Sequence, residues 1–158
     1  MARILVADDH DVLRRNLALS LTTAGHEVEE AANGNAALER LHEGYFDVIV
    51  SDLKMGGSDG LDVLRTARQL HPTTSVLLMT AFGSVSTAVE AMKHGAFDYV
   101  QKPFELEEME VKVEKALELK RLRNELDYLR NERQENYDFD RIVGTSESLK
   151  RVLGEKQK

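Results

Sequence analysis

Five short apolar runs, separated by segments with helical periodicity, dominate the first hundred residues of this chain. Each run is too short for a stable helix and is bounded by glycine, proline or polar residues, which is typical of buried strands. Buried strands that alternate with helices predict a parallel sheet with helices on both faces, joined by right-handed crossovers. We therefore expect a doubly wound α/β fold whose strands span residues 3–7, 27–31, 46–51, 75–79 and 97–101.

The segments between these runs place apolar residues at helical spacing, as helices that cover a sheet do. Val12, Leu17 and Leu21 are an example, and Gly25 follows them in the position where a glycine usually ends a helix. Ser84 is the expected N-cap of the fourth such helix. The expected helices span residues 12–24, 35–43, 60–70 and 85–94.

A change of composition at Glu105 marks the start of a longer helix. Glu, Lys, Arg and Leu dominate from here, and no proline or glycine occurs between Phe104 and Gly144. We expect a helix from Glu105 to about Arg133. Leucines spaced three, four and three residues apart form the seam of a short coiled coil, which predicts a homodimer through this helix. They are Leu119, Leu122, Leu126 and Leu129.

Composition excludes several classes of function. The formal net charge of −7 argues against binding of nucleic acid, which requires clustered Lys and Arg. There is no cysteine, so disulfides and thiolate metal sites are excluded. An acidic pair by position 8 is unlike a secretory signal, and no apolar run approaches the roughly 20 residues that span a bilayer. We expect a soluble cytoplasmic protein with no membrane contact.

Polar residues that directly follow the predicted strands are the strongest functional signal. Ligands of an open parallel sheet bind outside the carboxyl ends of its strands, and this edge collects all of these residues. Crowded carboxylates repel one another, and Mg²⁺ relieves that repulsion while leaving room for water and phosphate oxygens. An added lysine and hydroxyl suit transfer of a phosphoryl group to a carboxylate. The set is Asp8, Asp9, Asp52, Thr80 and Lys102.

Each of these residues has an ordinary structural interpretation when it is taken alone. An acidic pair at a strand end is more often a solvated turn or a helix cap than a metal site, and a lone lysine is usually a surface charge. The combination in this order favours function. The five histidines, His10 among them, have no metal-ligand spacing, and we interpret them as surface residues.

The ordered motifs Asp8-Asp9, Asp52, Thr80-Ala81 and Lys102-Pro103 resemble the response-regulator receiver family over residues 1 to about 120. The resemblance implies a flavodoxin- or CheY-like fold. It implies that Asp52 accepts a phosphoryl group from a sensor histidine kinase in the presence of Mg²⁺. It also implies a cis peptide bond before Pro103.

The same resemblance assigns roles to the other positions. Asp9 is the direct Mg²⁺ ligand, Asp8 holds metal-bound water, and Lys54 adds its backbone carbonyl. Thr80 and Tyr99 are the switch pair, and Lys102 contacts the phosphate. The loop after Asp52 reads Met55-Gly56-Gly57 where the family usually has Met-Pro-Gly, a departure that changes no ligand.

The end of the chain suggests a downstream output. Residues 141–153 are similar to the first residues of the AAA+ ATPase domain in NtrC-type activators, which work with the sigma-54 form of RNA polymerase. We thus expect a receiver domain at 1–120, an overlapping helical linker at 105–135 and a truncated ATPase domain at 139–158. Such a fragment is not an enzyme in the conventional sense, since the ATPase motifs lie beyond it.

Phosphorylation is expected to shift a two-state surface on the fourth helix, the fifth strand and the fifth helix, near Val85, Val89, Met92 and Tyr99. The long helix would then change dimer packing. Two alternatives remain open. One is a receiver-like dimerisation scaffold without phosphorylation. The other is a haloacid-dehalogenase-type phosphatase, although its Asp-x-Asp motif follows the first strand and its acidic pair comes late.

Overall fold

The computed structural model describes residues 1–81 and 85–145, with side-chain surroundings for 1–81 and 86–133. The chain divides into two compact units, Met1–Glu118 and Leu119–Lys158. Ser84, the predicted N-cap, lies outside the described residues, as do the last thirteen residues of the predicted ATPase segment.

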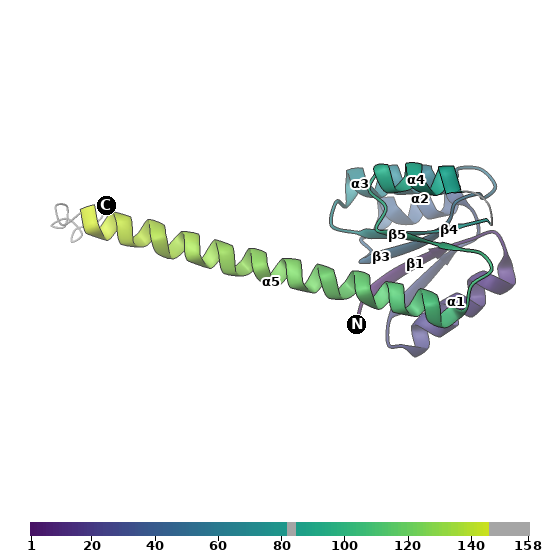
Figure 1. Ribbon diagram of the computed structural model, residues 1–158, viewed down its shortest axis with the longest axis horizontal. Coiled ribbons are helices and arrows are strands. Elements are labelled where there is room, and N and C mark those ends of the chain that lie inside the picture. The colour runs from purple at the N-terminus through teal and green to yellow at the C-terminus, as the bar shows by residue number, and fades with distance from the viewer. Residues whose placement is uncertain (82–84, 146–158) are drawn as a thin grey trace. The chain divides into compact units, whose positions relative to one another are not determined.

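The first unit contains a five-stranded parallel sheet in the order β2-β1-β3-β4-β5 (Figure 1). This order and direction confirm the predicted doubly wound α/β fold. The central strands β1, β3 and β4 are almost entirely buried, as expected for a sheet covered on both faces. The strands are β1 (Arg3–Ala7), β2 (Glu27–Ala31), β3 (Val48–Asp52), β4 (Ser75–Thr80) and β5 (Asp98–Gln101).

Helices cover both faces of this sheet (Figure 1). On one face α1 and the first part of α5 pack over Ile4 and Val6, and on the other α2, α3 and α4 pack over Leu5 and Ala7. This alternation follows from the two-residue period of a strand. The helices are α1 (Asp11–Thr23), α2 (Gly34–Glu43), α3 (Gly60–Leu70), α4 (Val85–Lys93) and α5 (Leu106–Thr145).

Two boundaries differ from the sequence prediction by more than one residue. Strand β3 begins at Val48 rather than at Phe46, because Asp47 turns its side chain back to accept a hydrogen bond from the Arg3 N–H at 2.9 Å. Helix α5 continues to Thr145, well past the predicted end near Arg133. No proline or glycine occurs in the helix before Gly144, so it meets no local stop signal until its last turn. The extension overlaps the segment predicted to begin an ATPase domain.

The loops at the carboxyl edge of the sheet are held by close backbone approaches. Gly34 begins α2 and donates its N–H to the carbonyl oxygen of Gly56 at 3.4 Å. A Cβ at Gly34 would overlap the backbone carbonyl of Ser58. The Ser58 hydroxyl donates to Asn35 at 2.8 Å, so the loop after β3 is tied to the start of α2. The peptide bond between Lys102 and Pro103 is cis, as the resemblance implied.

The close approach at Gly34 can be tested by substitution. Alanine is the better helix former, so Gly34→Ala would stabilise the protein if the position were open. We expect instead that it lowers the free energy of unfolding by about 1–3 kcal/mol, because the added methyl group overpacks the loop. Urea denaturation measures the change. Gly56→Ala is the matched control, since a Cβ there meets nothing within 4 Å; equal stability of the two variants would contradict this packing.

Candidate functional site

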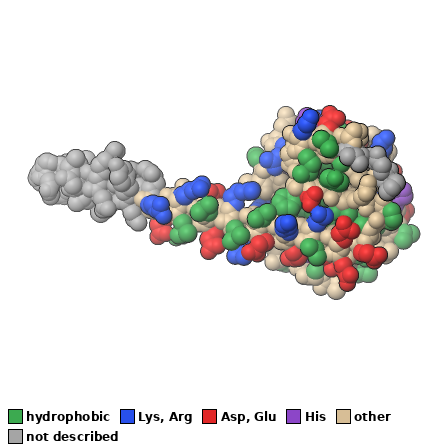
Figure 2. Space-filling model, viewed as in Figure 1, with side chains coloured by type: hydrophobic (Ala, Val, Ile, Leu, Met, Phe, Trp, Pro, Cys, Tyr) green, Lys and Arg blue, Asp and Glu red, His purple; other side chains and the backbone are tan. Residues whose placement is uncertain are grey.

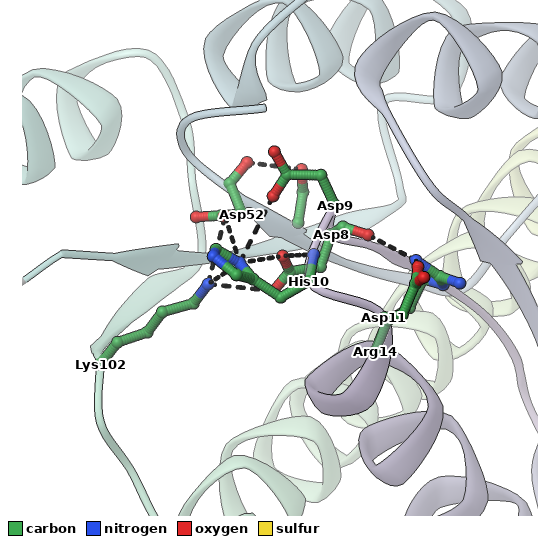
Figure 3. A network of polar contacts seen from close by, with 8 residues as sticks. Asp8, Asp9, His10, Asp11, Arg14, Asp52 and Lys102 are labelled. Atoms are coloured by element: carbon green, nitrogen blue, oxygen red, sulfur yellow. Dashed lines mark hydrogen bonds and ion pairs between the residues drawn. The ribbon is translucent and has the colours of Figure 1, made fainter. Parts of the chain in front are cut away.

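The carboxyl edge of the sheet brings the predicted polar residues together (Figure 3). Asp8 directly follows β1, Asp52 and Thr80 are the last residues of β3 and β4, and Lys102 directly follows β5. The parallel register aligns these strand ends, since Ala7 lies opposite Ser51 on β3 and Thr80 lies opposite Gln101 on β5. Asp8, Asp52 and Thr80 are buried, whereas Asp9 is exposed.

Lys102 joins the two buried carboxylates. Its ammonium group donates to Asp8 Oδ2 at 3.0 Å and to Asp52 Oδ2 at 3.1 Å. The Lys102 side chain is 19% exposed, and those of Asp8 and Asp52 are 0% and 8% exposed. Ion pairs in this partly dry setting are screened far less than surface pairs. The lysine therefore fixes the geometry of the acidic residues relative to one another.

The two buried carboxyl groups differ in pKa. Burial alone would raise the pKa of Asp8, but hydrogen bonds from the His10 backbone N–H and from Lys102 outweigh it, and the pKa lies below its ordinary value. Burial raises the pKa of Asp52, and the negative charge of Asp8 raises it further, against the opposing effect of Lys102. Of these two carboxylates, Asp52 is therefore the one whose charge the protein compensates less.

His10 also belongs to this site, which its sequence context did not lead us to predict. Its side chain is 68% exposed, in agreement with a surface residue, yet its ring faces the acidic cluster (Figure 3). His10 Nδ1 lies 2.9 Å from Asp8 Oδ1, 3.4 Å from Asp9 Oδ1 and 3.9 Å from Asp52 Oδ2. Its position directly after the acidic pair was the available signal, because a turn at Asp8 brings the next side chains back over the strand end.

Arg14 is the second residue that the sequence did not reveal. It is buried on α1, donates to the backbone carbonyl of Asp8 at 3.0 Å, and pairs with Asp11 at 2.8 Å and with Glu30 at 2.9 Å. Burial opposes the charge of Arg14, but Asp11 and Glu30 outweigh it and raise the pKa above its ordinary value. Arg14 therefore holds the turn between β1 and α1 and, through it, the Asp8 backbone.

The other predicted residues lie around the same edge. Lys54 is exposed, and its backbone N–H hydrogen-bonds the Asp52 carboxylate. Tyr99 is half-buried and packs against the hydrophobic cluster beneath α2, α3 and α4. A cavity of about 150 Å³ lies over Asp52, with Lys54, Ala81 and Lys102 in its wall. The geometry brings together Asp8, Asp9, Asp52 and Lys102, with Thr80 at the adjacent strand end, while Tyr99 packs under the neighbouring helices.

Chemically, the site offers a buried carboxylate beside a small open cavity, with positive charge from Lys102 on one side. Ligand atoms of Asp8, Asp9, His10 and Asp52 all lie within 4.8 Å of one another. Hard oxygen donors at this density suit a divalent cation such as Mg²⁺.

Comparison with known proteins then decides the family. A model of the response regulator receiver domain matches residues 4–114.

The chain belongs to the response-regulator receiver family. Among curated relatives, Escherichia coli AtoC is 37% identical over 147 residues, which cover 93% of this chain and 32% of AtoC. Escherichia coli ZraR is 41% identical over 115 residues, which cover 72% of this chain and 26% of ZraR. The chain therefore spans about a third or less of the length of these relatives.

Solved receiver structures agree with this assignment. The Brucella abortus NtrX structure in complex with ADP has a TM-score of 0.76 at 32% identity, covering 81% of this chain and 30% of NtrX. A receiver domain from Clostridium thermocellum has a TM-score of 0.73 at 32% identity, covering 77% of this chain and 98% of that one. These matches confirm the predicted resemblance to receivers of NtrC-type regulators, and they favour neither the scaffold nor the phosphatase alternative. In the described part of the chain, no helix is long and apolar enough to cross a membrane.

The raised pKa of Asp52 gives a test of the electrostatics in metal-free protein. Because the pKa of Asp52 is raised in the folded protein, ionised Asp52 lowers the free energy of unfolding at pH values above that pKa. This destabilisation is lost as pH falls through the folded-state pKa toward the ordinary pKa of an aspartate. Asp52→Asn is therefore expected to raise the midpoint of thermal unfolding by a few degrees near pH 7, with a difference that shrinks in acid. Calorimetry in EDTA measures it. Asp127→Asn on the exposed helix should change nothing, and a destabilised Asp52→Asn would contradict the account.

Proposed function

We propose that this receiver accepts a phosphoryl group on Asp52 from a sensor histidine kinase, in a Mg²⁺-dependent reaction. Response regulators of this family are phosphorylated by such kinases. The observation that carries the assignment to Asp52 is the bridge from Lys102 to Asp8 and Asp52. It places a positive charge beside Asp52, the less compensated of the two buried carboxylates, at a cavity of about 150 Å³.

The donor set fits Mg²⁺. Asp9 and Asp52 would supply carboxylate oxygens directly, Asp8 would order water bound to the ion, and the Lys54 backbone carbonyl would add a further oxygen. Mg²⁺ favours a small number of carboxylates together with water and phosphate oxygens. Asp8 raises the pKa of Asp52 by charge repulsion, which a divalent cation would relieve.

The reaction is an in-line displacement. One Asp52 oxygen forms a bond to phosphorus while the bond from phosphorus to the kinase histidine nitrogen breaks, and the electron pair leaves with the imidazole. When bound, Mg²⁺ supplies positive charge opposite the transferred phosphoryl oxygens. Lys102 and the Thr80 hydroxyl donate hydrogen bonds to those oxygens. Positioning and charge stabilisation supply most of the catalysis in such transfers.

The phosphorylated state is read out as a shift between two conformations. Thr80 and Tyr99 form the switch pair, and the affected surface lies on α4, β5 and α5. Val89 and Met92 on α4 are 47% and 40% exposed, which suits a surface that changes partners. The Val85 side chain lies outside the described set. From the similarity of residues 141–153 to the start of a AAA+ ATPase domain, we infer that the receiver controls such an ATPase and, through it, sigma-54-dependent transcription.

A homodimer through the leucine seam of α5 would transmit the change. Leu119, Leu122, Leu126 and Leu129 are between 40% and 51% exposed, and Figure 2 shows hydrophobic side chains interspersed with charged ones along the described part of this helix. With these leucines at the a and d positions, the flanking charges fall into two sets. Arginine occupies both e positions (123 and 130) and glutamate both g positions (125 and 132).

These charges favour a parallel arrangement of the two helices. In a parallel coiled coil a g residue faces the e residue five positions later on the other chain, so Glu125 of one copy meets Arg130 of the second. An antiparallel arrangement would place arginine against arginine and glutamate against glutamate. Like charges at these positions repel, which selects against it.

Phosphorylation is tested by incubation with acetyl phosphate and Mg²⁺, followed by intact-protein mass spectrometry. We expect wild type and the control Asp127→Asn to gain one phosphoryl group and Asp52→Asn to gain none. EDTA should abolish the gain. Sustained turnover of p-nitrophenyl phosphate would instead indicate a phosphatase, and an unmodified wild type would indicate a scaffold.

The dimer is tested by charge exchange, with sedimentation equilibrium as the measurement. Glu125→Arg and Arg130→Glu each place like charges at the g–e contacts and should weaken the dimer. The double variant restores opposite charges and should recover the wild-type association constant. Asn131→Glu is the control, because Asn131 is exposed and lies outside the a, d, e and g positions, so the seam is unchanged. A monomeric wild type, with or without beryllofluoride, contradicts the dimer proposal.

A further inference from the structure

The donor atoms around Asp52 include a nitrogen. His10 Nδ1 is 2.9 Å from Asp8 Oδ1, 3.4 Å from Asp9 Oδ1 and 3.9 Å from Asp52 Oδ2. Ligands bound at about 2.1 Å around an octahedral ion lie about 3.0 Å apart when adjacent and about 4.2 Å apart when opposite. All three distances fall within or close to this range. The imidazole therefore lies where a further ligand to a common ion would lie.

A hydrogen bond is the simpler explanation of one of these contacts. Nδ1–H donating to Asp8 accounts for the 2.9 Å distance. It does not account for Lys102, whose ammonium group lies 3.4 Å from the same nitrogen and can only donate. A nitrogen lone pair directed at the cluster agrees with the Lys102 contact.

We propose that the His10 imidazole is an additional ligand to the metal at this site, which gives the receiver a stronger preference for nitrogen-binding transition ions such as Ni²⁺ than a carboxylate-only site has. The inference rests on the proposed metal site and deepens it. Imidazole nitrogen suits Ni²⁺, Co²⁺ and Zn²⁺, whereas Mg²⁺ favours oxygen donors and water. His10 should therefore contribute to Ni²⁺ binding and contribute little to Mg²⁺ binding.

Because His10 is exposed, the same fold can bind an ion with or without the imidazole as a ligand. Its side chain is 68% exposed, so the ring can turn toward solvent when the ion prefers water. Its backbone N–H donates to Asp8 Oδ1 at 2.9 Å, and this contact does not depend on the ring. Substitution of the side chain should consequently leave the carboxylates in place.

Isothermal titration calorimetry at one fixed pH tests the metal preference. His10→Asn is expected to weaken Ni²⁺ binding at least about tenfold, in line with the cost of losing even an outer contact of a metal site, and to leave Mg²⁺ affinity little changed. His94→Asn is the matched control, because His94 is also exposed and lies near a carboxylate, Glu90, at 3.8 Å. Asp52→Asn should weaken the binding of both Ni²⁺ and Mg²⁺.

X-ray absorption at the nickel edge adds a readout that only direct ligation produces. Wild type and His94→Asn should show outer-shell scattering from an imidazole ring, and His10→Asn should lose it. Binding of Ni²⁺ that depends on Asp52 without imidazole scattering would overturn the role of His10 and leave the metal site intact. Absence of any Asp52-dependent binding of Mg²⁺ or Ni²⁺ would overturn the proposed metal site itself.

Discussion

The site depends on the bridge that Lys102 makes between two buried carboxylates. Asp8 and Asp52 end neighbouring strands of one sheet, and without a cation between them their charges would oppose burial. Lys102 reaches both from β5, the far edge of the sheet, so the strand order itself is required for this contact. Despite the bridge, burial and the charge of Asp8 leave the pKa of Asp52 raised, whereas that of Asp8 is lowered, and this difference separates Asp52, the proposed phosphoacceptor, from its neighbour.

Much of this arrangement could be predicted from the sequence because strand ends in a parallel sheet meet at one edge. The apolar runs located β1 and β2 at their observed bounds, and the residues after the runs supplied Asp8, Asp52 and Lys102. The local sequence pattern determines where each strand ends, and the parallel topology brings those ends to one edge of the sheet. The start of β3 was less predictable, because the Arg3 N–H bonds the Asp47 side chain rather than a backbone carbonyl of β3.

What the sequence did not show depends on side-chain direction. His10 was expected at the surface and is exposed, yet the turn held by Asp8 directs its ring toward the cluster. Arg14 falls within a helix pattern as one charge among several, and only the fold shows that it is buried against the Asp8 carbonyl. The end of α5 was placed too early, because no proline or glycine occurs in the helix before Gly144 and it continues to Thr145.

Locating the modified carboxylate tests the central claim most directly. Acetyl phosphate and Mg²⁺ are added, the acyl phosphate is reduced with borohydride, and peptides are sequenced by tandem mass spectrometry. Reduction converts a phosphorylated aspartate to homoserine at the position that carried the phosphoryl group. The account predicts homoserine at position 52 alone. Homoserine at Asp8 or Asp9, with Asp52 unmodified, would contradict it.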